Sequence, residues 1–176
     1  MNDLDAYLKR IQKIKWFTPH IGLNLGGINF KVQDSLRAFD VEAIPEYRSF
    51  KTFTDWGAIR DQAWSPEWAQ ARHKARDFAW VVEGKEREEA RDLAWETGFN
   101  GANNKMWHEI HHAIGCAAWD MRWAAAWAVA WGAQEVLAQS KGVYQGTGAF
   151  LKLVDLYELG VYPMGVIDGK FIVYMN

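Results

Sequence analysis

Residues 119–140 read WDMRWAAAWAVAWGAQEVLAQS, and this stretch decides the fold class. Tryptophan recurs at every fourth position, at residues 119, 123, 127 and 131, and alanine fills most of the positions between them. Alanine is the best helix former, and side chains four residues apart lie on neighbouring turns of a helix. The stretch therefore predicts a long helix that carries a stripe of indole rings.

The same four-residue spacing extends toward the N-terminus as a degenerate repeat. The motif Arg-Asp-x-Ala-Trp occurs at residues 60–64, 76–80 and 91–95. One register holds tryptophan or arginine at positions 56, 60, 64, 68, 72, 76 and 80, and a second holds tryptophan at 95, 107, 119, 123, 127 and 131. Because residues four apart are neighbours on a helix, a guanidinium can stack on the following indole, as at Arg60–Trp64, Arg76–Trp80 and Arg91–Trp95.

The period of the repeat does not match the helix. Units of four residues advance by about 40° around a helix of 3.6 residues per turn, so the indoles spiral and cannot all face one core. Two interpretations stay open, a tryptophan-rich core that packs helices and a contact surface made by the remaining indoles. The candidate binding residues are Trp80, Trp95, Trp119, Trp123, Trp127, Trp131 and Arg76.

The repeat over residues 56–134 resembles runs of Ala-Trp-Asp-Ala-Ala units in uncharacterised bacterial and phage proteins. This resemblance implies a helical repeat region and brings no activity with it.

The flanking segments predict an α+β fold. Apolar spacing predicts helices over 3–15 and 149–159, the second ending at Gly160. Alternation predicts strands over 28–32 and 46–53, and Asp168-Gly169 between two β-rich runs predicts a type I′ hairpin. Pro163 should place its strand at an edge or a bulge. We expect a mainly helical body of long Trp/Ala-rich helices with a small antiparallel sheet.

The helical region over 55–140 has expected breaks. They are at Gly84 and over 98–101, with a restart at Ser65-Pro66 and a last long helix from Asn103 or Asn104 to about Ser140. No linker separates residues 1–54, 55–140 and 141–176, so we expect a single domain over 1–176.

Composition excludes several classes of protein. The 176 residues carry a net charge of −2, where a nucleic-acid binder usually has a basic surplus. A single cysteine, Cys116, excludes an internal disulfide framework and is typical of a reducing compartment. The N-terminus lacks the apolar core of a signal peptide, and the longest apolar run, 123–133, is far shorter than the roughly 20 residues of a membrane span. We therefore expect a cytoplasmic protein with no membrane or nucleic-acid partner.

One motif suggests catalysis. Residues 108–112 read His-Glu-Ile-His-His, which is similar to the HExxH helix of zinc metallopeptidases. The resemblance implies His108 and His112 as zinc ligands and Glu109 as the general base. The extended form of that motif would need a third ligand at position 118, which is alanine, and Glu135 is the next acidic candidate.

The repeat offers a second explanation of this motif. A sequence with a period of four generates pairs of residues four apart, and both histidines fall directly after a repeat position. We rank this explanation above zinc binding and expect no cofactor. The leading hypothesis is a non-enzymatic protein that binds a protein partner or a second copy of itself. The alternatives are a zinc-dependent hydrolase and a small-molecule binder whose pocket is lined by Trp119, Trp123 or Trp127.

Overall fold

The α+β class is confirmed by a computed structural model of the chain. It describes residues 3–17, 24–49, 65–109 and 111–175, and over 103–120 only the course of the helical backbone. The elements in chain order are α1 (Asp3–Gln12), α2 (Leu25–Ala38), β1 (Ile44–Ser49), α4 (Pro66–Ala79), α5 (Lys85–Glu109), α6 (His111–Ser140), α7 (Ala149–Glu158), β2 (Val161–Ile167) and β3 (Lys170–Met175). No helix in the described part of the chain is long and apolar enough to cross a membrane.

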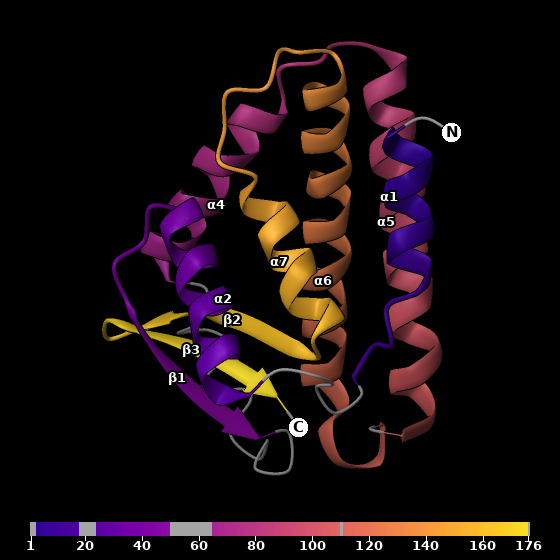
Figure 1. Ribbon diagram of the computed structural model, residues 1–176. Helices are drawn as coiled ribbons and strands as arrows, with labels where there is room; N and C mark the ends of the chain where they lie inside the picture. The colour runs from indigo at the N-terminus through magenta and orange to yellow at the C-terminus, as the bar shows by residue number, and fades with distance from the viewer. Residues whose placement is uncertain (1–2, 18–23, 50–64, 110, 176) are drawn as a thin grey trace.

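The long helices α5 and α6 form an antiparallel hairpin that spans the height of the molecule (Figure 1). Helix α1 packs against both of them, α7 packs along α6, and α2 packs on α7. Helix α4 lies on the side of α6 away from α5 and rises from the sheet toward the start of α5 (Figure 1). Helix α6 is therefore central and has neighbours on most sides, which explains why it is rich in alanine.

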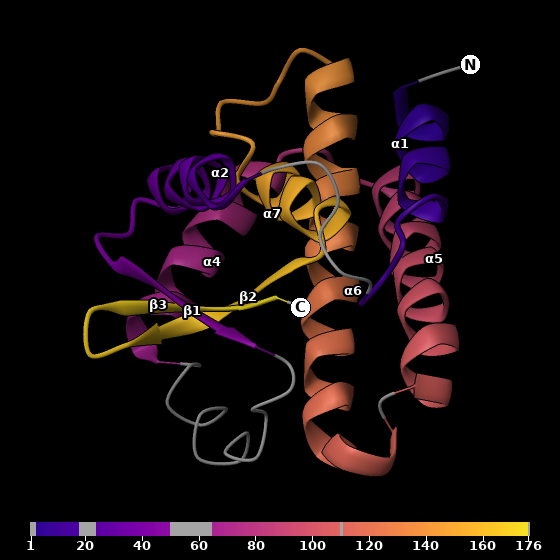
Figure 2. The same cartoon turned by 60° about the horizontal axis from the view of Figure 1, so that its bottom comes forward.

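The sheet has three strands in the order β1-β3-β2 and lies below α2 and α7 (Figure 2). The predicted hairpin is confirmed, because Asp168 and Gly169 both have positive φ, as a type I′ turn requires. The register shifts between Pro163 and Gly165 in the edge strand β2, which is the place predicted for this proline. The expectation of a purely antiparallel sheet is wrong, because β1 pairs with β3 in parallel and the sheet is mixed.

The core joins the sheet to the helices through aromatic rings. Trp68 of α4 packs against Phe171 of β3, with ring centroids 5.2 Å apart, and against Phe39 at 4.9 Å. Phe39 also meets Phe150 of α7 edge-on at 5.4 Å. These contacts bury Trp68 to 3% exposure and hold α4 over the end of the sheet.

The predicted strand over 28–32 is wrong, because these residues lie inside helix α2. Asn24 caps the helix by accepting a hydrogen bond from the backbone N–H of Gly27 at 2.9 Å. Ile28, Val32 and Leu36 are buried and follow a helical spacing, whereas Phe30 is 62% exposed. The apparent alternation therefore came from an exposed phenylalanine that happened to lie between two core residues. The second predicted strand, 46–53, corresponds in its described part to β1.

The expected break over 98–101, with a new helix from Asn103 or Asn104, is also wrong. Helix α5 runs through these residues to Glu109. Its glycines serve close packing, because a Cβ atom on Gly101 would lie 2.8 Å from Nε1 of Trp16, and one on Gly98 would lie 3.2 Å from Val129. The helix expected over 3–15 ends earlier, at Gln12, and three other predicted boundaries are confirmed. Ser65 caps α4 with Pro66 in the first turn, Gly84 with φ +95° separates α4 from α5, and α7 ends just before Gly160.

Candidate functional site

A row of aromatic side chains runs along α6. The indoles of Trp123, Trp127 and Trp131 follow one another by one helical turn, with centroids 6.4 and 6.1 Å apart. Trp80, at the end of α4, continues the series 5.5 Å from Trp131. We call these four residues, with Trp95 and Phe99 of α5, the aromatic row. Indoles four residues apart thus lie next to one another along a single helix, as the repeat predicts.

Two aromatic side chains of helix α5 pack against the indoles of α6. Trp95 and Phe99 stack on each other, with a centroid distance of 4.7 Å and an angle of 12° between their planes. Trp95 meets Trp123 at 5.3 Å and Trp127 at 6.4 Å in edge-to-face geometry. Such aromatic pairs contribute about 0.5–1.5 kcal/mol each beyond the area that they bury. The row therefore helps to fix the α5–α6 hairpin.

The exposure of these indoles follows from the difference between the four-residue period of the repeat and the 3.6 residues per turn of the helix. Along α4, Trp68 is 3% exposed, and Trp80, three repeat units later, is 42% exposed. A drift of about 40° per unit rotates the repeat position out of the core over this distance. Trp95, Trp123, Trp127 and Trp131 are half-buried. The prediction that some indoles leave the core is confirmed.

Two arginines, Arg76 of the repeat and Arg87 of α5, lie over the row. The guanidinium of Arg76 lies 5.4 Å from the ring centroid of Trp80, which confirms the predicted stack, and 5.8 Å from that of Trp131. Arg87 lies over the same Trp80 ring at 4.9 Å. Each cation–π contact at a partly exposed site is worth about 0.5–1 kcal/mol. Two cations therefore lie within cation–π distance of the Trp80 ring.

In the described copies of the Arg-Asp-x-Ala-Trp motif, each arginine pairs with the aspartate that follows it. Arg76 pairs with Asp77 at 3.1 Å and Arg91 pairs with Asp92 at 2.7 Å, the Arg-Asp step of the repeat motif. Among the described residues, the predicted stack of Arg91 on Trp95 is not found, because the cation–π contacts there involve other arginines. The third predicted stack, Arg60 on Trp64, lies outside the described residues. The surface around the row thus alternates positive and negative groups and has little net charge.

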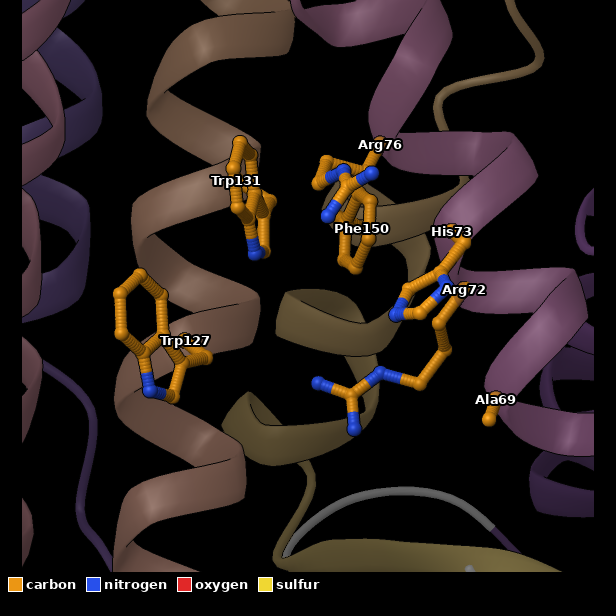
Figure 3. Close-up of a pocket in the computed structure, with 7 residues that line it drawn as sticks. All are labelled: Ala69, Arg72, His73, Arg76, Trp127, Trp131 and Phe150. Carbon is orange, nitrogen blue, oxygen red and sulfur yellow. The ribbon is translucent and has the colours of Figure 1, made fainter. Parts of the chain in front are cut away.

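Two pockets open on either side of α6 and share Trp127. One, of about 310 Å³, lies between α4 and α6 with Phe150 of α7 at its base (Figure 3). The other, of about 670 Å³, lies between α5 and α6 and is lined by Trp95 and Phe99 together with Arg91, Asp92, Glu96 and Asn100. Of the candidate binding residues, Trp127, Trp131 and Arg76 line the first pocket, and Trp95 and Trp127 line the second. The sequence did not indicate that these residues form two pockets, nor which other residues complete the walls.

The predicted zinc residues lie where two helices meet. His108 and Glu109 end α5, and His112 belongs to the first turn of α6. Residue 110, in the middle of the motif, lies outside the described residues. The side chains of His108, Glu109, His112 and Trp119 lie outside the described residues. Among the side chains that the structure does describe, no three of the kinds that bind metal lie together.

Glu135, the other acidic candidate, is fully buried on α6 and caps α7. Its carboxylate accepts hydrogen bonds from the backbone N–H groups of Leu151 at 2.9 Å and Phe150 at 3.3 Å, and from the Tyr144 hydroxyl at 2.8 Å. The N-cap residue of α7, Gly148, has no side chain to do this. Burial raises the pKa of Glu135 to about 7 despite these bonds. Glu135 therefore holds the start of α7 on α6 through these hydrogen bonds.

Comparison with known proteins gives no matching family model, no similar curated protein and no similar solved structure.

Proposed function

We propose that this chain is a non-enzymatic protein that associates with a second copy of itself through the aromatic row. The observation that carries the proposal is that the row is continuous over α4, α5 and α6 and yet only half-buried. Tryptophan and arginine are the residues that most often anchor protein interfaces. Large indoles held in fixed positions lose little entropy when a partner covers them.

The charges around the row favour a second copy as the partner. Arg76–Asp77 and Arg91–Asp92 place both signs side by side on the same surface. In a two-fold interface the same patch meets itself, so a patch that carries both signs can pair each arginine with an acidic group of the other copy. A net charge of only −2 opposes such an association weakly.

Analytical ultracentrifugation of the purified chain at low and high micromolar concentration tests the proposal. We expect the mass to rise from that of one chain, 20.2 kDa, toward twice that value. Trp80→Ala removes an exposed indole of the row and should shift the equilibrium toward the monomer. Phe30→Ala removes a ring that is 62% exposed on α2, away from the row, and serves as the matched control.

A mass that stays at one chain throughout the concentration range would refute self-association. Equal weakening by Trp80→Ala and Phe30→Ala would refute the role of the row. Thermal unfolding of both variants checks that each is folded at the temperature of the measurement.

A further inference from the structure

The pocket between α4 and α6 has walls of two different chemical kinds. The α6 wall consists of the indoles of Trp127 and Trp131, and Phe150 of α7 lies at the base (Figure 3). The α4 wall carries nitrogen-bearing side chains, those of Arg72, His73 and Arg76. None of the described residues that line the pocket is acidic. The pocket therefore offers flat apolar faces on one side and cations on the other.

Arg72 extends from α4 into this space, with its guanidinium directed toward α6 (Figure 3). It also interacts electrostatically with the buried Tyr157 of α7. Burial lowers the pKa of Arg72, because the charged form loses hydration there. A cation that has lost hydration is stabilised when an anion enters beside it, and a guanidinium can grip a carboxylate with two parallel N–H bonds.

Arg76 completes the charged wall. Its guanidinium lies 5.8 Å from the Trp131 ring centroid, at the boundary between the cationic and aromatic walls. Its carboxylate neighbour, Asp77, is 69% exposed and does not line the pocket. A ligand with its ring against Trp127 and Trp131 would thus place a carboxylate within reach of two arginines.

We infer that this pocket binds a small planar aromatic carboxylate, with its ring on the indoles of Trp127 and Trp131 and its carboxylate on Arg72 and Arg76. The volume of about 310 Å³ suits one or two fused rings and is at the lower end of the range for ligand sites. The pocket shares Trp127, Trp131 and Arg76 with the surface proposed for self-association, but the inference does not require a second copy, because every group that it uses belongs to one chain.

Isothermal titration with 2-naphthoate and with its uncharged analogue 2-naphthamide tests this inference on the full chain. We expect 2-naphthoate to bind more tightly than the amide, because only the acid can pair with the arginines. Arg72→Gln should weaken binding of 2-naphthoate about tenfold or more, the value of one charge-assisted bidentate contact, and leave the amide unchanged. Arg91→Gln, in the other pocket, is the matched control and should bind both compounds as the wild type does.

Arg76→Gln provides a second variant on the same wall, so the test holds even where Arg72→Gln lowers the stability of the fold. Equal affinity for acid and amide, no binding of either at millimolar concentration, or unchanged naphthoate affinity in both variants overturns the inference.

Measuring Trp80→Ala with naphthoate separates the two proposals. Retained binding in a monomeric Trp80→Ala chain supports the pocket whatever the oligomeric state, and binding lost there but kept in Phe30→Ala counts against it.

Discussion

The hydroxyl of Tyr7 donates a hydrogen bond to the backbone carbonyl of Val129 at 2.8 Å and thereby fixes α1 on α6. The contact is close because Gly132, in the next turn of α6, has no side chain. A Cβ atom on Gly132 would overlap the Tyr7 hydroxyl and lie 3.1 Å from the ring carbon that bears it. Glycine is therefore needed at position 132 because the Tyr7 side chain packs directly against the helix backbone there.

Gly132→Ala should destabilise the fold by about 1–3 kcal/mol, since the added methyl group forces Tyr7 and α1 outward. Tyr7→Phe alone should cost about 1 kcal/mol, the value of one hydrogen bond. The double variant should be more stable than the sum of the two losses predicts, because the phenylalanine leaves room for the methyl group. Urea unfolding of the four proteins measures this coupling. Strictly additive losses would show that the two residues do not interfere.

Gly101→Ala should also destabilise the chain, although alanine has the higher helix propensity by up to about 1 kcal/mol. The reason is that the new methyl group would lie 2.8 Å from Nε1 of the buried Trp16. Gly26→Ala in the first turn of α2 is the control, because its Cβ would have only the Asn24 side-chain oxygen nearby, at 3.4 Å. Thermal unfolding should show a lower midpoint for the Gly101 variant and an equal or higher one for the Gly26 variant. A more stable Gly101→Ala chain would contradict the packing of Trp16 on α5.

Glu135 should make stability depend on pH. Its folded-state pKa of about 7 lies above the unfolded value of about 4.3, so the folded chain binds more protons between these values. The contribution of this group is therefore fully present below about pH 4 and is lost as the pH rises through about 7, a change of order 3 kcal/mol.

Glu135→Gln should remove much of that dependence, because an amide stays neutral and its oxygen can still accept bonds at the start of α7. Denaturant unfolding at about pH 5 and about pH 8 checks this, with the variant losing less stability between the two than the wild type. Glu89→Gln, on the exposed face of α5, is the matched control and should follow the wild type. If the wild-type chain were more stable at the higher pH, stability would depend on pH in the opposite direction. That result would contradict the conclusion that burial raises the pKa of Glu135.

Metal content should be substoichiometric in protein purified without chelators. A zinc site of the HExxH kind needs both histidines on one helix, and here His108 belongs to α5 and His112 to α6. Elemental analysis of the wild type and of His108→Ala measures this directly. One zinc per chain, lost in His108→Ala, would instead support the metallohydrolase hypothesis.

Features that depend on a few adjacent residues could be predicted from the sequence. The start of α4 at Ser65-Pro66, the turn at Asp168-Gly169 and the stack of Arg76 on Trp80 each follow from local backbone preference or from the spacing of helical turns. The period of the repeat also showed that some of the indoles must leave the core, because the drift depends only on the pitch of the helix.

Tertiary packing decided the rest. Residues 25–38 form a helix because Ile28, Val32 and Leu36 are buried against other elements. The glycines of α5 and α6 are needed because a side chain of another element lies close to each of them. The pocket between α4 and α6 needs Phe150 from a third helix, far along the chain from Arg72. The sequence thus determined that a spiral of tryptophan and arginine must reach the surface, since helical pitch is a local property. Only the tertiary structure decided which helices flank it and what chemistry they present there, because that depends on contacts between distant segments.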